Sequence, residues 1–150
     1  MKAHWLALLL VVVPGGAAAQ DACDYFLPAL SAVPHETLTR DAGELQVVPD
    51  GKRYRGCEVV LVTTERLLAG KGVPEFQAEP GTDLYRAGWR GNPAYSADGP
   101  GTSLHGLERG NDLCLVSSAQ PAAVEGGAAD GSGVVVSSET VTITVQCRRK

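Results

Sequence analysis

Four cysteines constrain this chain more than any other feature, because all of them follow a segment typical of an export leader. Lys2 begins this leader, Trp5 to Val13 is an unbroken apolar run, and Ala17 to Ala19 are small residues at its end. A positive start, an apolar core and a small-residue exit are the order of a secretory signal peptide. The apolar run is too short to cross the ~30 Å of hydrocarbon in a bilayer. We therefore predict a cleaved signal peptide over residues 1–19. Residues 20–150 are then a single small domain exported from a bacterium, periplasmic or extracellular.

The cysteines stand far apart in the sequence, at Cys23, Cys57, Cys114 and Cys147. An even set in an exported chain predicts two disulfides. A zinc site is the alternative, but zinc cysteines usually come as close pairs such as C-x2-C. Three pairings are possible, and the chain order favours Cys23–Cys57 and Cys114–Cys147. Each bridge would close a loop of roughly 35 residues and contribute about 3–4 kcal/mol. We expect no metal and no cofactor.

Charge argues against nucleic acid as a partner, and hydropathy argues against insertion into a membrane. The chain has 150 residues, with 13 basic and 17 acidic side chains, and a formal net charge of −4. Bulk attraction to nucleic acid is therefore not expected. No apolar run beyond the leader is long enough to span a bilayer, so we expect no stable membrane insertion after cleavage.

Alternating and β-branched residues predict several strands. Thr140 to Cys147 alternates valine or isoleucine with polar residues, which is the pattern of a half-buried strand. Glu58 to Thr64 is short and rich in β-branched residues, as expected for a buried strand. Thr102 to Glu108 and Leu113 to Ser118 form a predicted hairpin, with the turn at Arg109–Asp112.

The N-terminal part of the domain predicts a helix. Asp21 is placed to cap it, and apolar residues recur at helical spacing as far as Leu30. Pro28 inside this span predicts a short or kinked helix. Glu65 to Ala69 is a predicted helical turn that Gly70 stops.

Other segments have weaker patterns. We predict an extended segment at Glu44–Val48 and a strand at Leu84–Arg90 with Trp89 packed inward. Gly91 to Gly101 is predicted to form turns. Residues 119–133 are poor in bulky side chains and predict a flexible Gly/Ala-rich loop.

The predicted fold class is α+β, with a short N-terminal helix packed on a mostly antiparallel β-sheet of four to six strands, stapled by disulfides. The arrangement resembles small exported bacterial α+β domains. A cysteine in the first helix precedes the Gly56-Cys57 strand, and Cys114 and Cys147 clasp the last strands. The resemblance is one of arrangement and carries no activity.

The densest polar segment contains the three residue types of an acyl-transfer triad, Asp98, Ser103 and His105. Ser103 and His105 are two positions apart on a predicted strand and point to the same face, whereas a triad turns its base onto the nucleophile. No G-x-S-x-G elbow surrounds the serine. A small hydrolase or metal-dependent enzyme using His105 and Asp98 is therefore only an alternative, and we assign no catalytic residue.

The first hypothesis is a non-catalytic binding or cell-envelope-associated domain, with a protein or envelope partner that the sequence does not identify. Tyrosine, tryptophan and arginine dominate interface hot spots, and they gather between positions 85 and 95. We expect Trp89 in the core, which leaves Tyr85, Arg90 and Tyr95 as candidate binding residues. A third hypothesis is an inhibitor or immunity-type protein that presents a long loop.

Overall fold

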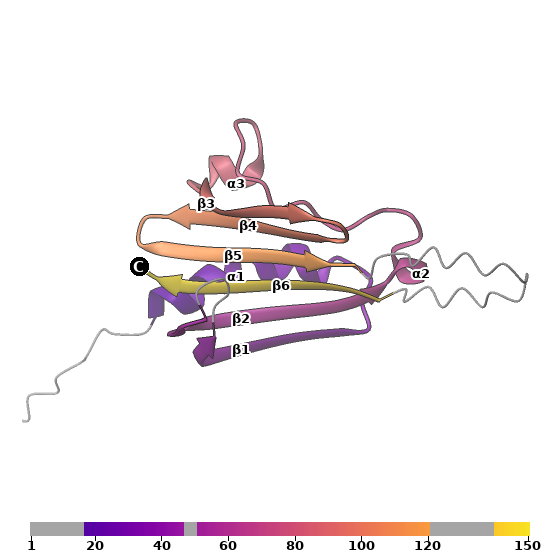
Figure 1. Ribbon diagram of the computed structural model, residues 1–150, viewed down its shortest axis with the longest axis horizontal. Helices are drawn as coiled ribbons and strands as arrows, with labels where there is room; N and C mark the ends of the chain where they lie inside the picture. The colour runs from indigo at the N-terminus through magenta and orange to yellow at the C-terminus, as the bar shows by residue number, and fades with distance from the viewer. Residues whose placement is uncertain (1–16, 47–50, 121–139) are drawn as a thin grey trace, which may run out of the picture.

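Six antiparallel strands form one open sheet in the computed structural model, which describes residues 17–46, 51–120 and 140–150 (Figure 1). The strand order is β1-β2-β6-β5-β4-β3. The helices are α1 (Ala17–Ser31), α2 (Glu65–Leu68) and α3 (Asp83–Arg86). The strands are β1 (Thr37–Gln46), β2 (Arg53–Thr64), β3 (Arg90–Gly99), β4 (Thr102–Arg109), β5 (Asp112–Ala119) and β6 (Thr140–Arg149). The predicted fold class, one main helix on an antiparallel sheet, is confirmed.

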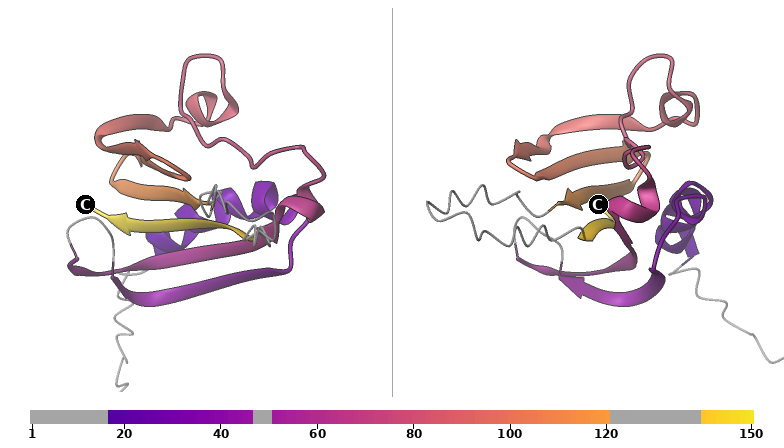
Figure 2. Two further views of the ribbon diagram at one scale, coloured as in Figure 1. Left: turned by 45° about the vertical axis from the view of Figure 1, so that its right-hand side comes forward. Right: turned by 90° about the vertical axis from the view of Figure 1, so that its right-hand side faces the viewer.

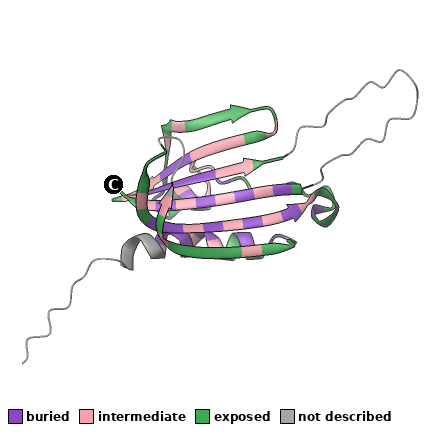
Figure 3. Ribbon diagram, turned by 60° about the horizontal axis from the view of Figure 1, so that its bottom comes forward, coloured by how far each residue is buried: buried purple, intermediate pink, exposed green. Residues whose placement is uncertain are grey.

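Helix α1 covers one face of the sheet, over β2, β6 and β5 (Figure 2). The strands beneath it alternate as the sequence predicted, because every second side chain of β6 from Val141 to Cys147 is buried. Phe26 and Leu30 of α1 are buried against this face. Figure 3 shows the resulting stripes of burial on the central strands and mostly exposed residues on the edge strand β1. Burial of each large apolar side chain contributes about 1.5–3 kcal/mol, so this layer supplies the main stabilisation of the domain.

Both predicted disulfides are confirmed. Cys23–Cys57 ties α1 to β2 with 6.1 Å between the Cα atoms, and Cys114–Cys147 joins opposed residues of β5 and β6 at 4.0 Å. Cys57 also lies opposite Cys147 in the β2–β6 register. The two bridges therefore form one row across the helix-covered face, in which the sulfur atoms of Cys23, Cys57 and Cys147 lie within 4.8 Å of one another.

The helix predictions are partly correct. Helix α1 begins at Ala17, so Asp21 lies inside the helix and the prediction that it caps the helix is wrong. The predicted helical turn is confirmed as α2. Thr64 caps the start of α2 by accepting a hydrogen bond from the Leu67 amide at 3.2 Å. The residue that caps its end, Ala69, has a left-handed φ of 50°.

The predicted strand at Leu84–Arg90 is wrong. Residues 83–86 form the helical turn α3, because the Thr82 side chain accepts a hydrogen bond from the Tyr85 amide and caps the turn. Trp89 follows α3 and is fully buried, which confirms its predicted inward packing.

The segment predicted as turns, Gly91–Gly101, is instead mostly the edge strand β3 paired with β4. Its register shifts between Asn92 and Ala97, so four residues lie opposite a single position of β4. Pro93 is tolerated in this bulge of an edge strand because no ladder hydrogen bond needs its missing N–H. The other edge strand, β1, is longer than the extended segment predicted at Glu44–Val48, and it begins at Thr37.

Some predictions concern residues that the structure does not describe. These are most of the signal peptide, the end of the Glu44–Val48 segment, and the Gly/Ala-rich loop beyond Gln120. Within the described ranges, no helix is both long and apolar enough to cross a membrane.

Candidate functional site

An aromatic cluster joins α1 to the segment that leads from α2 to β3. The Phe26 ring of α1 lies 5.6 Å from the Phe76 ring and 5.3 Å from the Trp89 ring, measured between centroids. Tyr25, the neighbour of Phe26, lies 5.8 Å from Trp89. The Arg109 guanidinium packs on this cluster, 4.6 Å from the Trp89 centroid and 5.4 Å from that of Tyr25. The aromatic cluster thus already holds one cation against its ring faces.

A groove of about 710 Å³ opens over this aromatic cluster, between α1 and residues 74–84. The aromatic residues that line it are Tyr25 and Phe26 of α1 and Phe76 of the facing segment. Three acidic residues, Glu75, Glu79 and Asp83, are also among the residues that line it. Neither lysine nor arginine is among the described residues that line this space, so its formal charge is negative.

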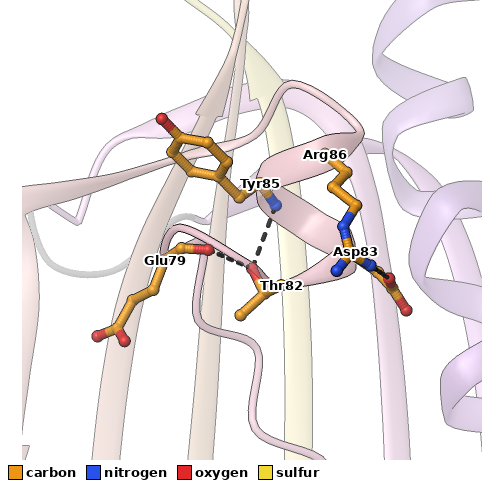
Figure 4. Close-up of polar contacts among 5 residues, drawn as sticks. All are labelled: Glu79, Thr82, Asp83, Tyr85 and Arg86. Atoms are coloured by element: carbon orange, nitrogen blue, oxygen red, sulfur yellow. Dashed lines mark hydrogen bonds and ion pairs between the residues drawn. The ribbon is translucent and has the colours of Figure 1, made fainter.

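Polar contacts around Thr82 fix one side of the groove (Figure 4). The Thr82 hydroxyl donates to the Glu79 carbonyl at 2.8 Å and accepts from the Tyr85 amide at 3.2 Å. These bonds hold the backbone of Glu79 next to the start of α3. The Asp83 carboxylate is paired with Arg86 at 2.7 Å. The remaining carboxylates, those of Glu75 and Glu79, are exposed and have no ion pair among the described residues.

The residues considered for a hydrolase line a second, smaller cavity. Asp98, Ser103 and His105 contribute to one space of about 290 Å³, together with Glu75 and Ser118. The Ser103 hydroxyl is 2.7 Å from the Ser118 hydroxyl. Within the described ranges, no hydrogen bond joins His105 to Ser103 or Asp98. Among all the described residues, only one group of three candidate metal ligands lies close together, and it consists of disulfide-bonded cysteines. The cavity gathers the residue types of a triad without the contacts between them that a triad requires.

The predicted binding residues make two separate sets of contacts. Arg90 lies over the Tyr85 ring at 3.8 Å and donates to the carbonyl oxygen of Tyr85 at 2.9 Å. Tyr95, in the β3 bulge, instead packs against Leu113 and Leu115. These leucines alternate with the helix-facing residues of β5, so Tyr95 lies on the face of the sheet opposite α1.

A polar network anchors the β3 bulge to the C-terminus. The Asn92 amide donates to the Glu108 carboxylate at 2.6 Å, and Lys150 pairs with the same carboxylate at 2.7 Å. The Lys150 hydrogen bond is the main cause that lowers the pKa of Glu108, and Asn92 adds to it, while desolvation opposes the shift. The folded state therefore favours the charged form of Glu108.

No known protein family, curated protein or solved structure matches this chain.

Sequence reasoning missed the acidic groove. Its two walls are separated by more than 40 positions in the chain, and no short motif links them. One available signal was the spacing Glu75, Glu79 and Asp83, which places an acidic residue at every fourth position without an intervening basic one.

Proposed function

We propose that the protein is an exported, disulfide-stabilised binding domain that holds a positively charged side chain of a partner protein in the groove between α1 and residues 74–84. The observation that carries this proposal is the composition of the groove, which is lined by aromatic and acidic residues, with no lysine or arginine among its described lining residues. The leader-like segment over residues 1–19 and the two disulfides support export.

The chemistry of the groove favours a lysine or arginine side chain. An alkyl stem can lie along the aromatic floor, while the charged head reaches a carboxylate at the rim. Glu75 and Glu79 are the carboxylates available for this, because Asp83 is paired with Arg86. Charge-assisted hydrogen bonds to a carboxylate are roughly twice as strong as neutral ones, so the rim selects for charge.

The test uses two capped tripeptides as probes, acetyl-Gly-Arg-Gly-amide and acetyl-Gly-Glu-Gly-amide, titrated into the isotope-labelled oxidised protein. The arginine peptide is expected to shift the amide resonances of Tyr25–Ala29 and of residues 74–84, with a Kd on the order of 1 mM, as befits one ion pair and one stacked side chain. The glutamate peptide is expected to shift neither segment.

Variants separate the groove from general electrostatics. The double substitution Glu75→Gln with Glu79→Gln should weaken arginine-peptide binding about tenfold. Glu36→Gln with Glu65→Gln removes the same net charge at exposed positions outside the groove and should leave binding unchanged. Equal binding of the two peptides, or equal weakening by the two double variants, would contradict the proposal.

A further inference from the structure

A basic end of the sheet brings together two segments that are almost 100 positions apart. β2 begins beside the end of β6, since Gly56 lies opposite Arg148 in the register (Figure 1). This juxtaposition gathers six of the 13 basic residues of the chain, which are Lys52, Arg53, Arg55, Arg148, Arg149 and Lys150. We call these six residues the basic end.

The positive charge of the basic end is only partly compensated by neighbouring acids. Glu44 lies opposite Arg55, Asp112 lies opposite Arg149, and Glu108 pairs with Lys150. Among the described residues at this end of the sheet, the basic side chains outnumber these three carboxylates. The chain as a whole has the opposite sign, with a net charge of −4. The molecule is thus electrically polarised along its strands.

The shape of the basic end favours an extended anionic surface over a single small anion. The basic residues lie on both faces of the strands, because residues of β2 and β6 alternate between the helix-covered and the open face. None of them lines the acidic groove or the His105 cavity. On the open face the Arg148 guanidinium lies 3.7 Å from the centroid of the Tyr54 ring. Tyrosine and arginine side chains are both amphipathic and both occur at the headgroup level of a bilayer.

We infer that the basic end docks the domain onto a membrane surface rich in anionic phospholipid, with phosphate groups as the recognised chemistry. Each basic residue near such a surface strengthens binding about fivefold. The negative charge of the rest of the molecule repels the same surface, so docking orients the strands with the basic end toward the lipid.

The experiment is co-sedimentation of the oxidised protein with vesicles of phosphatidylglycerol mixed with phosphatidylcholine, and with vesicles of phosphatidylcholine alone. Binding is expected only to the anionic vesicles, and it should weaken steeply as the salt concentration rises. The double variant Arg53→Gln with Arg149→Gln should weaken binding about 25-fold.

The matched control is Arg66→Gln with Lys71→Gln, which removes two exposed positive charges at the other end of the sheet. It should change binding less than twofold. A second variant, the single substitution Arg53→Glu, must weaken binding while the thermal midpoint stays within a few degrees of the parent. Equal binding to both vesicle types, equal losses in the two double variants, or competition by free inorganic phosphate or duplex DNA at equal charge concentration would overturn the inference.

Discussion

The two halves of the sheet are held together by different means. The first half consists of β1, β2, β6 and β5, and its ladders run without a register shift. It contains both disulfides and the alternating apolar residues beneath α1. The second half consists of β4, β3 and residues 73–89, and its β3–β4 ladder shifts register at Asn92. This half depends on a few large side chains, chiefly Trp89. We refer to the first half as the stapled half and to the second as the irregular half.

In this small disulfide-linked domain, adaptable surface is available in the second half of the sheet. A regular ladder with alternating burial leaves little freedom for its backbone, because a shift of one residue would turn every apolar side chain toward water. The irregular half has no such constraint. The acidic groove and the His105 cavity are both lined by residues 74–77 of this half. The stapled half provides the rigid support that the second half lacks.

The largest effect is expected from Trp89→Ala, which should lower the free energy of unfolding by about 3–5 kcal/mol. The fully buried indole contacts rings from α1 and packs beneath the Arg109 guanidinium, so its removal leaves a cavity at the junction of the two halves. Urea denaturation measures the loss. The exposed Leu67→Ala is the control and should cost less than about 0.5 kcal/mol.

Hydrogen exchange in Trp89→Ala tests whether the two halves of the sheet unfold separately. Amides of β3 and β4 should exchange much faster, while those of β2 and β6 keep most of their protection. Uniform loss of protection across the sheet would mean that the two halves unfold as one cooperative unit.

A smaller and more selective effect is expected from alanine at two strand glycines. A Cβ at Gly56 would collide with the Cys147 carbonyl oxygen, which belongs to the stapled ladder and cannot move alone. A Cβ at Gly106 would lie 2.6 Å from the Tyr95 Cβ, in the bulge of β3. We expect Gly56→Ala to cost about 3 kcal/mol and Gly106→Ala about 1–2 kcal/mol, because the bulge can shift away.

Gly91→Ala is the control for this pair, since a Cβ there meets nothing within 4 Å. Thermal unfolding of the three variants gives the ranking. A larger loss of stability for Gly106→Ala than for Gly56→Ala would show that the bulge of β3 is more rigid than the ladder that contains the disulfides. That result would contradict the difference between the two halves.

The stapled half could be predicted from the sequence because its signals are local. The alternation from Val141 to Cys147 gave β6, the β-branched run at Glu58–Thr64 gave the buried part of β2, and the spacing and order of the cysteines gave their pairing. Edge strand β1 was found only in part, because most of its residues are exposed and its polar sequence lacks alternation.

The irregular half could not be predicted in the same way. The Gly, Asn and Pro of Gly91–Gly101 are typical of turns, and only pairing with β4 makes the segment a strand. Leu84–Arg90 has a strand-like composition, but the Thr82 cap followed by Asp83 was a local helix signal. The groove walls come from distant segments, so tertiary packing alone creates the site.

The smallest effect is expected at Glu108, which links the β3 bulge to the C-terminus. Glu108→Gln removes the ion pair with Lys150 and should cost about 0.5 kcal/mol at neutral pH, as is usual for a partly exposed pair. Because the folded state lowers the pKa of Glu108, its contribution is present above the ordinary glutamate pKa of 4.5 and is lost as pH falls through the lower folded value.

The difference in stability between the parent protein and Glu108→Gln should therefore shrink on acidification and vanish once the pH is well below the folded-state pKa of Glu108. Urea titrations at neutral and acidic pH measure this difference. A difference that persists unchanged in acid would mean that the bulge is anchored by the Asn92 hydrogen bond alone, and that charge contributes nothing to the weaker half of the sheet.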